Sequence, residues 1–145
     1  MFSSGSISAS VVAVTANVTS PSDWTKMVQT AQSRFGGLDI LVNNAGTSYK
    51  NKPTLEVAEA EYDRVMAVNV KSIFLSVPAA IPALRQRGGG SIINIASIGA
   101  MRPRPGLVWY NASKAAVANV CPPSSFFLFP SCYPYYFEKE VKIQI

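Results

Sequence analysis

The chain has 145 residues, 48% of them hydrophobic, and its 13 basic and 8 acidic side chains give a net charge of +5. This length suits one domain with a single core. The basic residues are scattered, which argues against nucleic acid as a partner, and the two cysteines lack metal-ligand spacing. No signal peptide is evident and no apolar run approaches membrane-spanning length, so we expect a soluble, cytoplasmic protein without membrane contact.

The first predicted elements are a strand and a helix. VVAVTA (11–16) is a β-branched run that is typical of a buried strand. A helix follows, with Ser20 as its N-cap, Pro21 at its first position and Asp23 completing a capping box. Gly36 and its neighbouring glycine end this helix.

A second strand and a long helix come next. LDILV (38–42) is a buried strand that runs directly into NNAG (43–46). The residues from about 59 to 87 have helical periodicity. Within this helix we expect Pro78 and Pro82 to kink or shorten the last turns.

The third strand precedes a third helix. GGG (88–90) ends the long helix, SIINIAS (91–97) is the strand, and WYNASK (109–114) lies on the helix that follows. Alternating strands and helices predict an α/β fold, a Rossmann-like parallel sheet with helices on both faces.

The last 25 residues interrupt this alternation. CPPSSFFLFPSCYPYYFEKEVKIQI (121–145) has neither helical nor strand periodicity. Residues 122–131 can all be encoded with pyrimidines at the first two codon positions, as at the end of an intron. We therefore divide the chain into a disordered N-terminus (1–10), a partial domain (11–120) and an aberrant tail (121–145), with read-through of an unspliced intron as the hypothesis for the tail.

Proton chemistry in this chain cannot use histidine, because there is none. Tyr110 and Lys114 are four residues apart, so a regular helix would place them on one face. A free tyrosine has a pKa of about 10, and an ammonium within ~4–6 Å lowers such a value by ~1–3. On its own the spacing is weak, since a helix face with a solvated lysine is the commoner explanation.

Other polar residues gather at the same predicted edge of the sheet. Ser97 and the NNAG segment (43–46) follow two parallel strands, and ligands of such sheets bind at the carboxyl ends of the strands. Asn69 lies on an apolar helix face, where a buried amide needs partners.

Together these residues resemble the short-chain dehydrogenases/reductases. The resemblance rests on NNAG, on the Asn of AVNVKS, on the Ser of NIAS and on YNASK thirteen residues after that Ser, and it covers about 11–120. It implies an NAD(P)-dependent oxidoreductase, truncated at both ends, that acts on a small-molecule carbonyl or alcohol. The intact family forms homo-oligomers, and the choice between NAD and NADP stays open.

The resemblance also implies roles for single residues. Tyr110 would be the general acid/base, Lys114 would favour its phenolate and bind the nicotinamide ribose, and Ser97 would orient the substrate oxygen. Asn69 would support a proton relay. The residues expected to contact the cofactor are Asn17 and Val18 at the adenine, then Asn43, Ala45, Gly46, Tyr110 and Lys114. The family more often has Asp where this chain has Asn17.

One part of the family pattern is absent. A glycine-rich turn between a strand and a helix normally holds the cofactor pyrophosphate, whereas GGG (88–90) follows a helix and precedes a strand. Two hypotheses therefore stay open: an oxidoreductase, and a non-catalytic truncated remnant or misannotated splice product. A third, an anion- or membrane-surface binder that uses FFLF, has little support.

Overall fold

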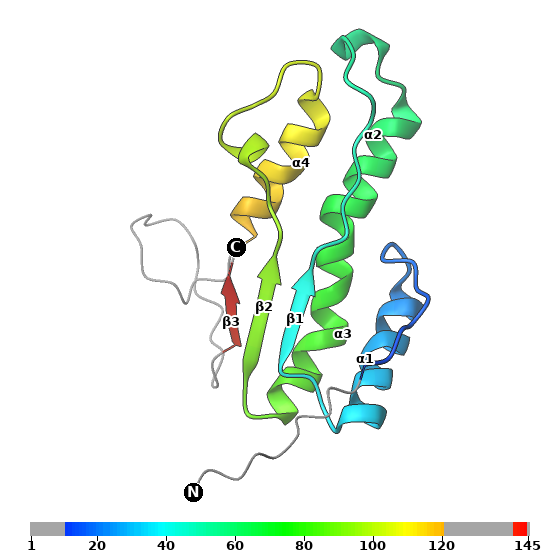
Figure 1. Ribbon diagram of the computed structural model, residues 1–145, viewed down its shortest axis with the longest axis vertical. Coiled ribbons are helices and arrows are strands. Elements are labelled where there is room, and N and C mark those ends of the chain that lie inside the picture. Colours follow the sequence, from blue (N-terminus) through cyan, green and yellow to red (C-terminus); the bar gives the residue numbers. More distant parts are fainter. Residues whose placement is uncertain (1–10, 121–140, 145) are drawn as a thin grey trace, which may run out of the picture.

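The structure is a computed structural model that describes residues 11–120 and 141–144. Three parallel strands form one sheet in the order β1 (Ile40–Asn43), β2 (Gly90–Asn94) and β3 (Val141–Gln144). Figure 1 shows α3 (Ser72–Gln86) behind the sheet, α1 (Pro21–Phe35) beside α3, and α4 (Val108–Asn119) beyond the tips of the strands. The predicted Rossmann-like parallel α/β fold is confirmed in this partial form.

The sheet is covered on one face by the described helices, so the expectation of helices on both faces is wrong for this part of the chain. Ile92 is buried against α3, in a cluster with Val28, Ala80 and Leu84. On the opposite face Ile40 and Val42 are 59% and 49% exposed. β1 was predicted to be buried, but its alternate side chains have no described element above them.

β1 and β2 pair as parallel neighbours. Ile40 lies opposite Ser91, and Asn43 lies opposite Asn94. β2 ends at Asn94, three residues before the end at residue 97 that the sequence predicted for this strand. Ser97 therefore lies in the loop beyond the strand, as the N-cap of the short helix η3 (Ile98–Ala100).

The predicted strand at 11–16 is wrong. These residues are described and form no strand, and Val11 is 88% exposed. A strand requires backbone partners on a neighbouring strand. In the described structure the outer edge of β1 faces no other strand, and residues 11–16 do not pair there.

The tail contains a strand that its sequence did not suggest. Val141–Gln144 pairs with β2 in parallel, with Val141 opposite Gly90. The prediction that 121–145 lacks strand structure is therefore wrong for these four residues. The proposed disorder of 1–10 and the character of 121–140 concern residues outside the described structure.

Helix α1 begins and ends as predicted, with one difference. The Ser20 side chain accepts the N–H of Asp23, and Gly36 ends the helix with a φ of +80°, which favours glycine. The capping box is incomplete, however, because the Asp23 carboxylate accepts the N–H of Asn17 at 2.7 Å rather than that of Ser20. The carboxylate thereby holds the loop before the helix.

The long helix is continuous from Glu59 to Gln86 and comprises α2 (Glu59–Met66), the π-helical segment η2 (Ala67–Lys71) and α3. The prolines do not shorten it, because the packing of Ala83 and Leu84 into the core holds its last turns. An 18-residue stretch of this helix has a mean hydropathy of 1.5, so by length and composition alone the helix could cross a membrane, contrary to expectation. Its contacts with β1, β2, α1 and α4 are those of a core helix.

Candidate active site

The carboxyl ends of β1 and β2 lead into two loops that meet the amino-terminal half of α4. Asn43 ends β1 and is followed by Ala45 and Gly46, and Ser97 follows β2. Tyr110 and Lys114 lie one turn apart on α4. The backbone order alone thus brings the predicted catalytic residues to one edge of the sheet.

Ser97 and Tyr110 both lie next to Gly99. A Cβ built on Gly99 would be 3.5 Å from the Oγ of Ser97 and 3.6 Å from the Cε1 of Tyr110. The Ser97 hydroxyl accepts the N–H of Gly99 at 3.1 Å. Because one lone pair is used in this way, the hydroxyl proton is available to a substrate oxygen.

Lys114 and Asn69 lie together beside Gly46. A Cβ on Gly46 would be 3.5 Å from the Nζ of Lys114 and 3.6 Å from the Oδ1 of Asn69. Lys114 is 6% exposed, and its ammonium donates to the backbone carbonyl of Ile95 at 2.7 Å. An ammonium has three donors, so this bond fixes the amine and leaves others for a ligand.

Asn69 connects three segments through its side chain. Its Oδ1 accepts the N–H of Thr47 at 2.7 Å, and its Nδ2 donates to the Thr47 carbonyl and to the Oγ of Ser113 at 3.0 and 2.9 Å. The Ser113 hydroxyl donates in turn to the backbone carbonyl of Tyr110 at 2.7 Å. The sequence analysis missed Thr47 and Ser113, although the costly burial of an amide at position 69 indicated that partners were required.

The Asn43 side chain is buried and bonds to the neighbouring strand and to α3. Its Nδ2 donates to the Oδ1 of Asn94 on β2 at 2.8 Å and to the Oγ of Ser76 on α3 at 3.3 Å. Its Oδ1 is buried without a partner in the described structure. These contacts tie the two strands together immediately before the Ala45–Gly46 turn.

Asn17 and Val18 are not brought to this cluster. Their polar contacts are local: the Asn17 side chain accepts from Thr19, and the Val18 carbonyl accepts the indole N–H of Trp24 at 2.8 Å. Figure 1 shows their loop beside α3, separated from α4. The predicted adenine contact therefore stays a prediction.

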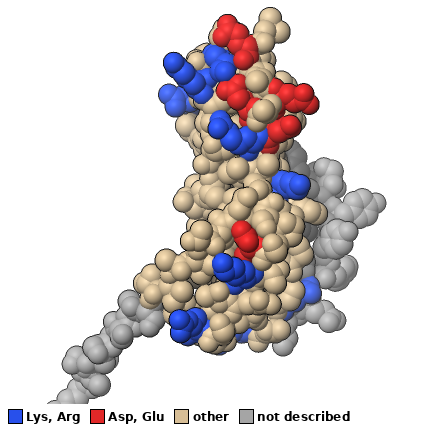
Figure 2. All heavy atoms as spheres, turned by 90° about the vertical axis from the view of Figure 1, so that its right-hand side faces the viewer, with Lys and Arg blue, Asp and Glu red and all other residues tan. Residues whose placement is uncertain are grey.

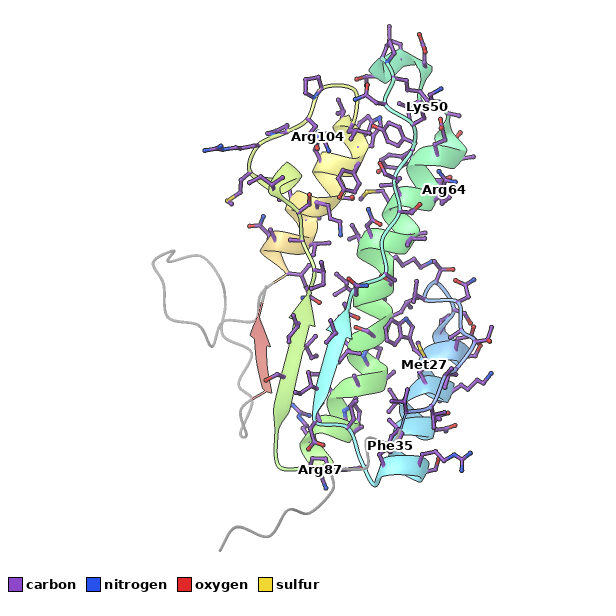
Figure 3. All side chains as sticks on the ribbon, viewed as in Figure 1. Met27, Phe35, Lys50, Arg64, Arg87 and Arg104 are labelled. Atoms are coloured by element: carbon purple, nitrogen blue, oxygen red, sulfur yellow. The ribbon has the colours of Figure 1, made fainter. Side chains whose placement is uncertain are left out.

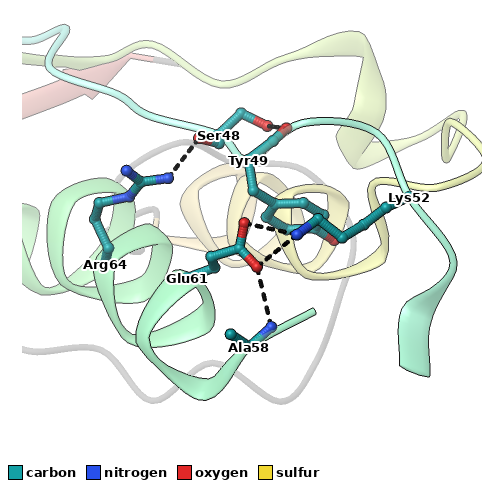
Figure 4. Close-up of polar contacts among 6 residues, drawn as sticks. All are labelled: Ser48, Tyr49, Lys52, Ala58, Glu61 and Arg64. Carbon is teal, nitrogen blue, oxygen red and sulfur yellow. Dashed lines mark hydrogen bonds and ion pairs between the residues drawn. The ribbon is translucent and has the colours of Figure 1, made fainter. Parts of the chain in front are cut away.

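Charged side chains gather at the end of the molecule that carries α2 and the loop before it, as Figure 2 shows. Lys52 forms an ion pair with Glu61 at 2.9 Å, and Glu61 also accepts the N–H of Ala58 at the start of α2 (Figure 4). The Lys52 ammonium, and after it the Ala58 N–H, hold the pKa of the Glu61 carboxyl below its ordinary value of 4.5. This pair fixes the loop next to the site.

A pocket of about 430 Å³ borders the site on the side of η3 and α4. Gly99 and Asn111 form part of its wall, whereas Ser97, Tyr110 and Lys114 do not line it. Asn111 donates to the Arg104 carbonyl at 2.9 Å, and its Oδ1 is buried without a partner in the described structure. The pocket is therefore adjacent to the candidate catalytic residues but separate from them.

The described residues fit one end of a nicotinamide cofactor. The exposed Ala45–Gly46 turn has no bulky side chain, so a flat ring can approach it, and the buried Lys114 ammonium is the donor beside it. The phosphate end finds no counterpart among the described helices, since none begins at a glycine-rich turn after a strand. No cluster able to hold a metal ion occurs among the described residues.

The described structure is a parallel α/β sheet with Ser, Tyr and Lys side chains near the carboxyl ends of its strands, where open α/β sheets bind their ligands. A family model described as short chain dehydrogenase matches residues 3–122. The chain belongs to the short-chain dehydrogenase/reductase family.

Known relatives agree with this assignment. The chain is 47% identical to 4-formylbenzenesulfonate dehydrogenase TsaC1/TsaC2 of Comamonas testosteroni, over 72% of this chain and 41% of that protein. It is 36% identical to human dehydrogenase/reductase SDR family member 4, over 77% of this chain and 40% of that protein. The chain thus spans less than half the length of these curated relatives.

Solved structures extend the likeness to the fold. The 3-ketoacyl-(acyl-carrier-protein) reductase from Brucella melitensis, complexed with NADH, superposes with a TM-score of 0.71 at 41% identity, over 74% of this chain and 46% of that one. Levodione reductase superposes with a TM-score of 0.72 at 31% identity, over 77% of this chain and 43% of that one.

Proposed function

We propose that the chain carries the catalytic part of an NAD(P)-dependent oxidoreductase that interconverts a carbonyl and an alcohol. The observation that carries this proposal is the meeting of Ser97 and Tyr110 at Gly99, with the buried Lys114 ammonium one helical turn from Tyr110. A bound nicotinamide would supply or accept the hydride. The chain's own residues then have to orient the substrate and move one proton.

The proposed proton transfer uses three side chains. The Ser97 hydroxyl donates a hydrogen bond to the substrate oxygen and holds it beside Tyr110. In the direction of reduction the Tyr110 hydroxyl gives its proton to that oxygen, and in oxidation the phenolate takes the proton back. Lys114, held by the Ile95 carbonyl, stabilises the phenolate by its positive charge.

Asn69 contributes by position. Its buried amide fixes Thr47, directly after Gly46, and reaches α4 through Ser113. We assign it the task of keeping the Gly46 turn and the helix of Tyr110 in register. The proposed proton relay through Asn69 would run past the Lys114 ammonium, which lies beside the same glycine.

A second candidate is a non-catalytic remnant, and a specific observation favours it for the chain on its own. Among the described residues there is no phosphate-binding turn, and one face of the sheet is bare. Such a chain would keep the catalytic side chains without binding the cofactor tightly.

A fluorescence titration of the 145-residue chain with NADH and with NADPH separates the two candidates. For an oxidoreductase we expect saturable binding of one cofactor and reduction of an aldehyde or ketone, with 4-formylbenzenesulfonate as one probe because a relative is named for it. Tyr110→Phe should abolish the reduction and preserve the binding. Absence of both binding and turnover would instead identify the remnant.

A further inference from the structure

The loop after Gly46 is tied alternately to the long helix and to the start of α4. We call residues 47–52 the strap. On the long-helix side, Asn69 holds Thr47, and Arg64 donates to the Ser48 carbonyl at 3.1 Å (Figure 4). On the α4 side, the strap contacts residues 105–109 at three points. Figure 3 shows Lys50 of the strap and Arg104, just before α4, at the same end of the molecule.

The central contact on the α4 side is made by Tyr49. Its hydroxyl accepts the backbone N–H of Trp109 at 3.0 Å, although the two residues are 60 positions apart. Tyr49 is 6% exposed, so water competes little for this bond. Trp109 is the second residue of α4 and immediately precedes Tyr110.

The contact satisfies a donor that α4 cannot satisfy locally. The first N–H groups of a helix have no partner within it and are usually capped by Ser, Thr, Asn or Asp. The N-cap of α4 is Leu107, which makes no side-chain hydrogen bond. The hydroxyl of Tyr49 therefore acts as the cap from a distant part of the chain.

Two further contacts hold the same segment. The N–H of Lys52 donates to the Gly106 carbonyl at 3.2 Å, and the Asn51 amide donates to the Pro105 carbonyl. Gly106 has a φ of +74°, and a Cβ there would collide with the Asn51 side chain. The strap thus fits closely against the residues that lead into α4.

We propose that Tyr49 is a positioning residue for the general acid/base Tyr110, an inference that rests on the proposed function. By capping Trp109 it fixes the first turn of α4, and so the direction in which the Tyr110 phenol leaves the helix. The strap directly follows Gly46, and Gly46 lies beside Lys114 and Asn69. A single loop would therefore set the Tyr110 ring relative to the cofactor side of the site.

The test uses Tyr49→Phe in the full chain, with Tyr62→Phe as the matched control. Tyr62 also lies against Trp109, with ring centroids 5.2 Å apart, but the contact is between the rings. We expect Tyr49→Phe to speed hydrogen exchange of the Trp109 amide about fivefold, the value of one lost hydrogen bond of ~1 kcal/mol. It should also shift the ring resonances of Tyr110, followed by NMR of ring-labelled tyrosine. Tyr62→Phe should change neither quantity.

The outcomes decide the proposal separately from the proposed function. If Tyr49→Phe leaves the Trp109 amide and the Tyr110 ring resonances as they are in Tyr62→Phe, the proposal is overturned. If only the Trp109 amide changes, Tyr49 is a helix cap and nothing more, which also overturns it. Should Tyr49→Phe fail to fold, Asn51→Ala, which removes another contact of the strap with the start of α4, must shift the Tyr110 ring resonances relative to Tyr62→Phe, and unchanged resonances would overturn the proposal. Turnover that survives Tyr110→Phe would reject the proposed function, whatever the amide exchange shows.

Discussion

The side-chain amide of Asn69 donates to the hydroxyl of Ser113 at 2.9 Å, and both groups are buried. This bond joins the π-helical segment of the long helix to Ser113 of α4, the residue immediately before Lys114. The same amide also binds both backbone groups of Thr47. One side chain therefore holds three segments of the candidate site together.

Replacement of Asn69 by Ala should destabilise the chain by ~2–4 kcal/mol, because it removes the hydrogen bonds of this amide with the half-buried Thr47 backbone and with the buried Ser113 hydroxyl. Urea unfolding followed by circular dichroism measures this loss. The matched control is Asn119→Ala, which removes an exposed amide from α4 and should change the free energy of unfolding by no more than about 0.5 kcal/mol. Equal losses in the two variants would contradict the assignment of Asn69 as the hub.

The Lys52–Glu61 pair predicts a pH dependence of stability. The folded-state pKa of Glu61 lies below its ordinary value of 4.5, so the folded chain favours the carboxylate. The stabilisation is therefore present above that ordinary value and is lost as the pH falls through the lower, folded-state pKa. Thermal unfolding from pH 7 downward should show wild type above Glu61→Gln in melting temperature, with the gap closing in acid.

The control for this pair is Glu59→Gln, which removes another carboxylate from the first turn of α2. This variant keeps the ion pair between Lys52 and Glu61. Its melting temperature should therefore fall with decreasing pH as the wild-type melting temperature does. A gap between wild type and Glu61→Gln that stays constant down to strongly acidic pH would disprove the ion pair as its cause.

The bare face of the sheet predicts self-association. Ile40 and Val42 are exposed there, beside the outer edge of β1, which pairs with no described strand. Exposed apolar patches and open edges promote association. The double variant Ile40→Thr/Val42→Thr should stay monomeric at higher concentration in sedimentation experiments, with stability within about 0.5 kcal/mol of wild type.

Ile92→Thr serves as the buried counterpart of that variant. Ile92 is 1% exposed, and the substitution introduces a hydroxyl into the core, so it should cost ~2–4 kcal/mol. If the double variant associates as readily as wild type, a different surface of the chain is responsible.

The parts of the fold that local chemistry governs could be predicted from the sequence. Ser20 and Gly36 mark the ends of α1 because a hydroxyl cap and a positive φ are requirements of single positions. Residues 11–16 have the composition of a strand and form none, since pairing depends on a neighbour that composition does not reveal. The π-helical segment at Asn69 could not be predicted either, because a search for the 3.6-residue period of an α-helix does not detect it.

The candidate site divides along the same line. Ser97, Tyr110 and Lys114 could be predicted because strand ends and a helical turn bring them together in any parallel sheet of this order. The contact between Tyr49 and Trp109 could not, because it spans 60 residues and depends on how the strap folds. Hydrogen bonds between residues so far apart do not produce a characteristic residue spacing in the sequence.

Gly99, which lies next to Ser97 and Tyr110, offers a test of how closely the candidate site is packed. A Cβ at this position would lie 2.8 Å from the Oδ1 of Asn111. The Asn111 side chain is buried, and its Nδ2 donates to the Arg104 carbonyl. In Gly99→Ala either the Asn111 side chain or the backbone at residue 99 must therefore shift. We expect a loss of ~1–3 kcal/mol in stability, as for other overpacked sites. The Cβ would make ordinary contacts with the Oγ of Ser97 at 3.5 Å and the Cε1 of Tyr110 at 3.6 Å, so we expect the loss to arise at Asn111.

A double-mutant cycle with Asn111→Ala isolates the cause. Removal of the amide relieves the contact, so Gly99→Ala should cost less in the Asn111→Ala background than in wild type, with a coupling of ~1 kcal/mol. Urea unfolding of the four proteins gives this coupling. Strict additivity would show that Asn111 does not limit the space at Gly99.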